Sequence, residues 1–373
     1  MNFVIITHVQ HIKENSRYYG YAPYVREMNI WLKYVDQVTV VAPIETTKLD
    51  NIHLNYQHNN IKFKEVPNFN TISFKHSLRT LFKLPSLLWT IFLAMKKADH
   101  IHLRCPGNMG LLGCLVQVLF PNTAKTAKYA GNWDPNAKQP FSYKIQKWIL
   151  NNTFLTKNMQ VLVYGEWEGS SKNIKPFFTA TYSETKKELI LPRPLQQKIN
   201  FVFVGTLSIG KKPLYAIQLV ENLKKLGIDV QLHLFGDGIL RTELEKYIAS
   251  HQLAGCVFLK GNQSKDVIEQ AYKESHFLIL ASKSEGWPKV VAEAMFWGCL
   301  PLTTNVSCVN YMIGNGSRGK LLDLNLEDDT QLVFDILHNK AQYLKMCMEA
   351  RDWSKHYTTE YFESEIVKLL ATS

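Results

Sequence analysis

Two glutamates give the clearest indication of chemistry in this sequence. Glu285 and Glu293 follow an apolar run, Phe277–Ala281, and Pro288 between them marks the first turn of a helix. Carboxylates in this order can both face the space beyond the carboxyl end of a buried strand, where open α/β sheets bind ligands. The helix start suits a phosphate, and a carboxylate accepts hydrogen bonds from sugar hydroxyls. The alternative for each glutamate alone is a solvated surface acid.

A second loop supplies positive charge. An apolar strand ends in Gly205 and Thr206, and the chain continues through Lys211 and Lys212 to a helix that begins with a proline. Lysine ammonium groups in such a loop can bind a diphosphate, and a solvated loop lysine is the alternative. Glycines that permit tight turns end the next two predicted strands, at Gly236 and Gly261.

Strand-like and helix-like segments that could position these loops alternate along the chain, which indicates parallel α/β sheets. With 373 residues, two domains are expected. A polar, proline-containing stretch around 183–198 interrupts the alternation. We therefore predict an α/β fold with two doubly wound Rossmann-like domains facing a cleft, over 1–190 and 191–355, and a C-terminal helix within 356–373. The strands predicted in the first half are Phe3–Thr7, Gln37–Val41, His100–Arg104, Lys128–Gly131 and Gln160–Tyr164, with a long polar loop over His8–Pro23.

The string Ser284–Met295 resembles the Glu-x7-Glu signature of the retaining glycosyltransferases of family 4 (glycosyl transferases group 1), which have the GT-B fold. The lysine loop and the glycine turns are similar to further elements of that family, in the same order from about Phe201 to Lys320. The family usually has an Arg where this chain has Thr206, so one positive charge is missing here.

The resemblance implies a role for each residue. Lys211 and Glu285 would be catalytic, Lys211 on the departing diphosphate and Glu285 on the donor sugar, and Glu293 would hold the ribose. The last helix would cross back onto the first domain. Lysines and a helix end would replace a metal ion, so neither a metal nor a cofactor is expected beside the nucleoside diphosphate sugar co-substrate. The implied donor-binding residues are Gly205, Thr206, Lys212, Gly236, Gly261, Gly286, Trp287, Pro288, Lys289, Val290 and Glu293.

The first domain is expected to bind the acceptor, with fewer indications. Gly20 is the single glycine of the long first loop, and Arg104 ends a predicted strand, where it could meet an anion or form a structural ion pair. Asn132 and Asp134 could contact sugar hydroxyls, or could simply form a turn. No histidine is carried over from the family to this domain.

Lys and Arg exceed Asp and Glu by 43 to 32, which favours anionic partners such as nucleotide diphosphates or anionic lipids. The six cysteines form no C-x-x-C pair, which favours a reducing, cytoplasmic location. The basic, aromatic segment Phe74–Lys97, with Phe82, Trp89 and Phe92, could contact the inner face of a membrane; the alternative is a helix with one buried face and solvated lysines. Nucleic-acid-binding signatures are absent, so no nucleic acid partner is expected.

The resemblance therefore implies a retaining glycosyltransferase that moves a sugar to a glycan or lipid-linked acceptor in cell-surface polysaccharide or glycolipid biosynthesis. Two alternatives stay open: a sugar-nucleotide epimerase with the same two-domain architecture, and a non-catalytic scaffold. Thr206 in place of the family's Arg and the absence of the family's cleft histidine are the features that keep the scaffold open.

Overall fold

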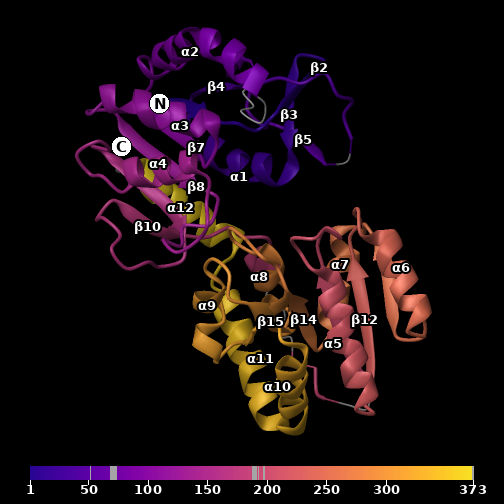
Figure 1. Ribbon diagram of the computed structural model, residues 1–373. Coiled ribbons are helices and arrows are strands. Elements are labelled where there is room, and N and C mark those ends of the chain that lie inside the picture. Colours follow the sequence, from indigo (N-terminus) through magenta and orange to yellow (C-terminus); the bar gives the residue numbers. More distant parts are fainter. Residues whose placement is uncertain (51, 68–73, 187–190, 192, 196–197, 372–373) are drawn as a thin grey trace. The chain divides into compact units, whose positions relative to one another are not determined.

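The computed structural model describes residues 1–50, 52–67, 74–186, 191, 193–195 and 198–371. The chain forms two compact units (Figure 1): unit 1 comprises Met1–Phe178 and Tyr361–Ser373, and unit 2 comprises Thr179–Glu360. Each unit is a parallel sheet with helices packed on it, so the predicted α/β class with two doubly wound domains is confirmed. Part of the predicted linker, 187–190, 192 and 196–197, lies outside the described residues.

Unit 1 is built on a seven-stranded parallel sheet with the order β10-β9-β8-β7-β1-β4-β6. The central strands are short, buried runs, as parallel strands covered on both faces are. The strands are β1 (Asn2–Ile6), β4 (Gln37–Pro43), β6 (Ile61–Val66), β7 (His100–Cys105), β8 (Ala124–Tyr129), β9 (Met159–Tyr164) and β10 (Ile174–Phe177). The helices are α1 (Ala22–Leu32), α2 (Phe74–Met95), α3 (Asn108–Val116), η1 (Gln117–Leu119), α4 (Phe141–Leu150) and α12 (Thr359–Ala371).

The segment predicted as a long polar loop after the first strand is instead mostly a hairpin. β2 (His11–Glu14) and β3 (Arg17–Tyr21) pair antiparallel, and β5 (His53–Asn55) joins them in a small sheet. Asn15 and Ser16 both have positive φ, the backbone of a two-residue hairpin turn whose twist matches the strands. Strand pairing therefore satisfies backbone groups that a polar loop would leave to water.

The C-terminal helix belongs to unit 1, as predicted. The Phe362 ring of α12 packs edge-on against Phe177 and Phe178, with centroids 5.4 and 5.6 Å away, and Tyr361 stacks on Phe178 at 5.2 Å. Lys33 and Tyr34 bind the Glu363 carboxylate at 2.9 and 2.6 Å. The chain that leaves unit 1 at Phe178 thus returns to it through aromatic packing and charged contacts.

Unit 2 has a six-stranded parallel sheet with the order β13-β12-β11-β14-β15-β16. Its strands are β11 (Lys198–Val204), β12 (Asp229–Phe235), β13 (Val257–Gly261), β14 (Phe277–Leu280), β15 (Leu300–Thr304) and β16 (Lys320–Leu322). Its helices are η2 (Glu184–Lys186), α5 (Pro213–Lys225), α6 (Arg241–Ser250), α7 (Lys265–Glu274), α8 (Lys289–Phe296), α9 (Val309–Met312), η3 (Gly314–Gly316), α10 (Leu326–His338) and α11 (Lys340–Ser354).

The strand order of each sheet reverses at one point. In unit 2 the chain runs outward from β11 through β12 to β13, then crosses to β14 on the other side of β11. In unit 1 the same reversal falls between β1 and β7. Loops that follow the two strands at such a switch point diverge and leave a crevice, which is where open α/β sheets bind ligands.

Candidate functional site

The lysine loop of unit 2 follows β11 at the switch point. The backbone N–H groups of Lys211 and Lys212 donate to the Ser208 carbonyl at 3.1 and 3.2 Å, and Lys212 takes a left-handed conformation, φ 49°, directly before α5. The Lys283 N–H, in the loop after β14, donates to the Gly210 carbonyl at 2.8 Å. The loops after β11 and β14 are therefore joined by a backbone hydrogen bond.

The two predicted catalytic residues meet across these loops. The Lys211 ammonium donates to the Glu285 carboxylate in an ion pair, although the residues are 74 positions apart in the sequence. Their side chains are 28% and 12% exposed, so both are partly withdrawn from water but still reachable by a ligand. The pair places one positive and one negative group at the carboxyl ends of adjacent strands.

Glu293 occupies a different environment, within α8. One carboxylate oxygen accepts a hydrogen bond from the Thr181 hydroxyl at 2.8 Å, and the other accepts one from the Tyr272 hydroxyl at 3.3 Å. Burial and the Glu293 charge raise the pKa of Tyr272 well above its ordinary value, so this hydroxyl stays a donor. Thr181 and Tyr272 are partners of Glu293 that the sequence did not reveal, because nothing local links them to it.

The turn between Glu285 and α8 is fixed by a hydrogen bond and by aromatic packing. The Gly286 carbonyl accepts from the Ser307 hydroxyl at 2.7 Å. Trp287 is 8% exposed and stacks near Trp353 and Tyr357, with ring centroids 6.4 and 5.9 Å away. Pro288 is buried at the N-cap of α8 and makes no side-chain cap, while Lys289 and Val290, in the first turn, are half-buried. The predicted donor-binding turn is therefore a supported backbone, with Trp287 in an aromatic cluster.

Three glycines bring neighbouring strand ends together. The Gly205 N–H donates to the Phe235 carbonyl at 2.9 Å, and the Gly236 N–H donates to the Gly261 carbonyl at 2.8 Å. Gly236 has φ +132°, and a Cβ there would lie 2.0 Å from the Gly205 carbonyl oxygen. Only glycine permits this approach, so the loops after β11, β12 and β13 form one continuous rim. Thr206 is exposed on that rim.

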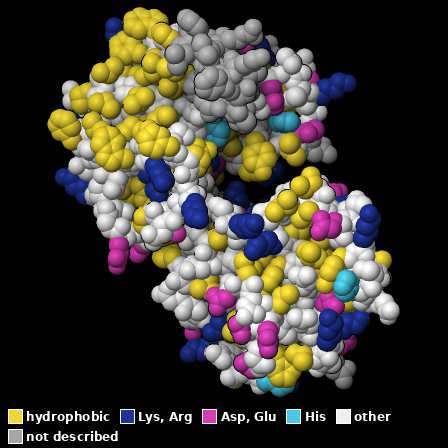
Figure 2. All heavy atoms as spheres, in the orientation of Figure 1, with side chains coloured by type: hydrophobic (Ala, Val, Ile, Leu, Met, Phe, Trp, Pro, Cys, Tyr) yellow, Lys and Arg dark blue, Asp and Glu magenta, His cyan; other side chains and the backbone are white. Residues whose placement is uncertain are grey.

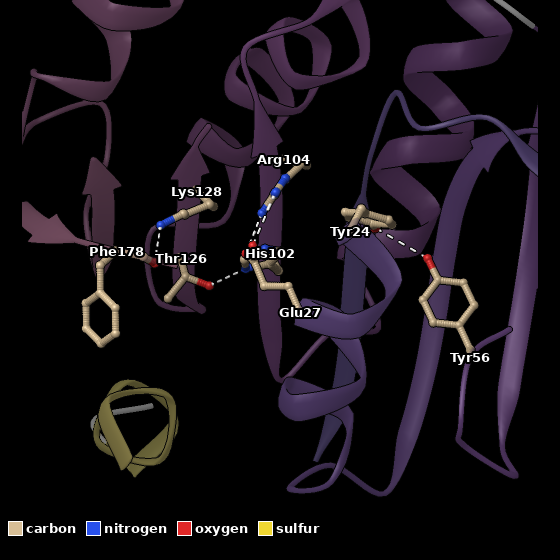
Figure 3. Close-up of polar contacts among 8 residues, drawn as sticks. All are labelled: Tyr24, Glu27, Tyr56, His102, Arg104, Thr126, Lys128 and Phe178. Atoms are coloured by element: carbon tan, nitrogen blue, oxygen red, sulfur yellow. Dashed lines mark hydrogen bonds and ion pairs between the residues drawn. The ribbon is translucent and has the colours of Figure 1, made fainter. Parts of the chain in front are cut away.

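The residues predicted on the acceptor side are not brought together. Arg104 forms a buried ion pair with Glu27, with nitrogen–oxygen distances of 2.6 and 3.4 Å, and lies over the Tyr24 ring (Figure 3). This is the structural ion pair that the sequence left open. Asn132 and Asp134 accept hydrogen bonds from the N–H groups two residues on, at 2.9 and 2.8 Å, as turn-forming residues do. Gly20 is buried in the hairpin, opposite His11.

Unit 1 has a cavity of about 560 Å³ at its own switch point, which the sequence did not assign. It is lined by His8 after β1 and by Gly107, Asn108 and Met109 at the start of α3, together with Glu45, His53 and Tyr143. Surrounding protein atoms and then the Arg104 charge lower the pKa of His8, so its imidazole is neutral at pH 7. The position of His8 directly after the first strand was the sequence signal for this site.

Among the described residues, no group of three or more His, Cys, Asp or Glu side chains is arranged to hold a metal ion. In the same part of the chain, no helix has both the length and the hydropathy that crossing a bilayer requires.

Comparison with known proteins gives a consistent result. Residues 187–353 match the family model described as glycosyl transferases group 1. An uncharacterized glycosyltransferase of Methanocaldococcus jannaschii is 24% identical over 191 residues, 51% of this chain and 52% of that protein. The lipopolysaccharide 1,6-galactosyltransferase of Salmonella typhimurium is 30% identical over 148 residues, 38% of this chain and 41% of that protein. The chain thus spans about half the length, or less, of these curated relatives.

Solved structures match over the whole chain. HepE of Anabaena, in complex with UDP and glucose, has a TM-score of 0.68 at 13% identity, covering 100% of this chain and 99% of that one. WaaG, a glycosyltransferase involved in lipopolysaccharide biosynthesis, has a TM-score of 0.62 at 13% identity, covering 100% and 98%. Identities this low establish the fold alone. The chain therefore has the GT-B fold, and its residues 187–353 match the family model of the glycosyl transferases group 1.

Proposed function

We propose that this chain is a retaining glycosyltransferase that moves a sugar from a nucleoside diphosphate sugar to a glycan or lipid-linked acceptor, in the biosynthesis of a cell-surface polysaccharide or glycolipid. The observation that carries the proposal is the Lys211–Glu285 pair at the switch point of unit 2, directly before the start of α8. Support for the substrate class comes from the similar proteins: HepE was solved with UDP and glucose, and the Salmonella relative is a lipopolysaccharide galactosyltransferase.

Positive groups and a helix end would bind the diphosphate. Lys211 and Lys212 lie in the loop after β11, and Pro288 gives α8 no side-chain cap, so the N-terminal end of the helix can face a phosphate. As the bond between the anomeric carbon and the diphosphate oxygen breaks, negative charge grows on that oxygen. Groups already held in place stabilise this charge without reorganising, which lowers the barrier.

Glu285 and Glu293 would have separate tasks. Glu285 lies 12% exposed beside Lys211, where it can contact the donor sugar and stabilise the positive charge that develops there. Glu293 accepts two hydroxyl hydrogen bonds within unit 2 and has further lone pairs for the ribose. The acceptor hydroxyl forms the new bond to the anomeric carbon, and its proton leaves with the diphosphate.

The acceptor would bind in the 560 Å³ cavity of unit 1, where the neutral imidazole of His8 can exchange hydrogen bonds with a hydroxyl. The positive groups on the diphosphate make a metal ion unnecessary in this scheme. Activity should therefore survive excess EDTA, and a loss that Mg²⁺ or Mn²⁺ restores would refute the metal-free scheme.

The function is tested by incubating the chain with a panel of nucleoside diphosphate sugars, with and without lipid and glycan extracts. A transferase releases nucleoside diphosphate, whereas an epimerase yields a new sugar nucleotide without any acceptor. Glu285→Gln should keep the diphosphate affinity of the parent and lower turnover, because its charge acts mainly in the transition state. Lys246→Ala, an exposed lysine of α6, is the matched control and should retain full turnover. Release of diphosphate at the parental rate by Glu285→Gln would refute the assignment.

A further inference from the structure

The positive charge of this chain is concentrated in one segment. Residues 66–165 contain twelve Lys or Arg, two Asp and no Glu, and the rest of the chain holds 31 basic and 30 acidic residues. The segment thus supplies nearly all of the net charge of +11. It lies wholly in unit 1 and contains α2, α3 and α4.

The same segment holds the exposed Phe and Trp side chains of the described residues. Phe141, Phe154, Trp148 and Trp89 are 78%, 76%, 64% and 60% exposed, and among the described residues no other Phe or Trp is exposed. Leu119 and Leu115, at 65% and 49%, extend the set. We call these six residues the α2–α4 surface. Exposed apolar side chains that gather in one patch commonly mark an interaction site.

Trp89 lies on α2, Leu115 on α3, and Phe141 and Trp148 on α4, while Leu119 lies in η1 and Phe154 in the turn after α4. α3 packs against both α2 and α4, and the inner sides of these helices bury Leu87, Ile91, Leu112 and Ile149 in the core of unit 1. In Figure 2 hydrophobic side chains crowd the area where Figure 1 draws α2, α3 and α4, with Lys and Arg side chains around them.

The exposed lysines of this segment are not paired with acids in the part of the chain whose side chains the structure describes. Within the described residues, none of the exposed lysines Lys96, Lys97, Lys138, Lys144 and Lys157 forms an ion pair. Lys157 instead lies over the Phe154 ring, at 5.4 Å. Glu168 lines a cavity of about 550 Å³ beside Trp148, so one acid borders the surface. The balance of charge nonetheless stays positive.

We propose that the α2–α4 surface docks on an anionic lipid bilayer. Trp and Phe side chains partition into the headgroup region, and unneutralised lysines beside them are attracted to anionic lipids. A second copy of this chain would bring like charges together. The contact differs from the single interfacial helix expected over Phe74–Lys97. Leu87 and Ile91 of that helix are buried in the core, and Phe82 lies outside the residues whose side chains are described. The α2–α4 surface is instead spread over α2, α3, η1, α4 and the turn after α4. The proposal does not depend on the donor chemistry.

The test is co-sedimentation of the full chain with vesicles of phosphatidylcholine alone or with 30% phosphatidylglycerol. We expect binding to the anionic vesicles that weakens as salt rises from about 50 to 500 mM, because salt screens exposed charges. One basic residue contributes roughly fivefold to the partition coefficient, so Lys144→Glu, which changes the charge by two, should lower it about 25-fold. Phe154→Ser, which removes an inserted ring, should lower it at least about fivefold.

Matched controls come from unit 2. Lys246→Glu reverses an exposed lysine, and Leu226→Ser removes a 52% exposed leucine; both should sediment like the parent. Circular dichroism confirms that each variant is folded. A blue shift of Trp fluorescence on anionic vesicles, lost in Trp89→Ser/Trp148→Ser, would place the aromatic side chains in the bilayer.

Three results would overturn the proposal. One is the absence of sedimentation at low salt. Another is an equal loss of binding in the unit 2 controls. The third is tight binding to duplex DNA or RNA that competes with vesicles and is unaffected by Phe154→Ser, which would identify the surface as a site for nucleic acid backbones.

Discussion

Replacing Glu293 by Gln tests the ribose assignment with little change of shape. The carboxylate accepts hydrogen bonds from Thr181 and Tyr272 at 2.8 and 3.3 Å. A carboxylate offers about four acceptor positions, so about two remain for the paired hydroxyls of a ribose. The substitution removes the negative charge and turns one acceptor oxygen into a donor.

The size of the effect follows from those bonds. A hydrogen bond to a charged group contributes about 1.5–3 kcal/mol, so Glu293→Gln should weaken nucleoside diphosphate binding about ten- to a hundredfold. The folded state should lose less, about 1 kcal/mol or under, because the Thr181 hydroxyl can rotate and accept from the new amide.

Calorimetric titration with the best-binding nucleoside diphosphate measures the affinity, and urea unfolding measures the stability. Tyr272→Phe is the matched control, since it removes one hydroxyl and keeps the charge. It should weaken binding about fivefold or less. If Glu293→Gln binds diphosphate like the parent and instead unfolds easily, Glu293 is an internal support for Thr181 and α7, and the ribose assignment is refuted.

Three further predictions concern stability. Gly236→Ala places a methyl group 2.0 Å from the Gly205 carbonyl oxygen, so the free energy of unfolding measured in urea should fall by about 2 kcal/mol or more. Gly255→Ala, with open space around it, should change that free energy by about 0.5 kcal/mol or less. Equal losses in the two variants would contradict the close approach. Arg104→Leu leaves Glu27 buried and unpaired and should lower the free energy of unfolding by about 3–5 kcal/mol. The double variant Arg104→Leu/Glu27→Leu should regain most of that stability. A double variant no more stable than the single one would contradict this. Burial lowers the pKa of four histidines below the ordinary value of about 6.5, so below about pH 6.5 the unfolded chain binds more protons than the folded one. The free energy of unfolding should therefore decrease as the pH falls, by roughly 1.4 kcal/mol per imidazole at pH 5.5. Equal thermal midpoints at pH 7.5 and 5.5 would contradict this. These histidines, with their pKa values in the folded protein, are His11 (about 4), His100 (about 4), His102 (about 3) and His276 (about 4).

The central strands were predictable, whereas edge and hairpin strands were not. β14 and β7 are short, fully buried runs, and burial on both faces demands apolar or paired side chains. β6 and β10 lie at the edges of their sheet, where one side faces solvent, and they contain Lys62, Lys64 and Lys175. The predicted strand Lys128–Gly131 begins about four residues after the observed start of β8 at Ala124, because Lys125 and Thr126 interrupt the apolar pattern there.

For the site, the sequence predicted which residues carry chemistry but not their partners. Glu285 and Lys211 stand out by the strands that precede them, yet their ion pair depends on the side-by-side position of β11 and β14, which no local pattern determines. Thr181, whose hydroxyl donates to Glu293, lies 112 positions before it in the sequence. On the acceptor side, Arg104 occupies the end of its strand as predicted, but Glu27 on α1 neutralises it there. Partner identity is a property of the fold, since it requires knowing which distant elements become neighbours.

The most direct test of the account is a calorimetric titration of the unmodified chain with UDP, GDP, ADP, CDP and dTDP, repeated with Lys211→Ala. We predict that at least one diphosphate binds one-to-one and stabilises the fold by mass action, and that Lys211→Ala weakens this binding at least about tenfold. If none of the five binds at millimolar concentration, or if Lys211→Ala binds like the parent, unit 2 does not hold a nucleotide at Lys211, Glu285 and Glu293.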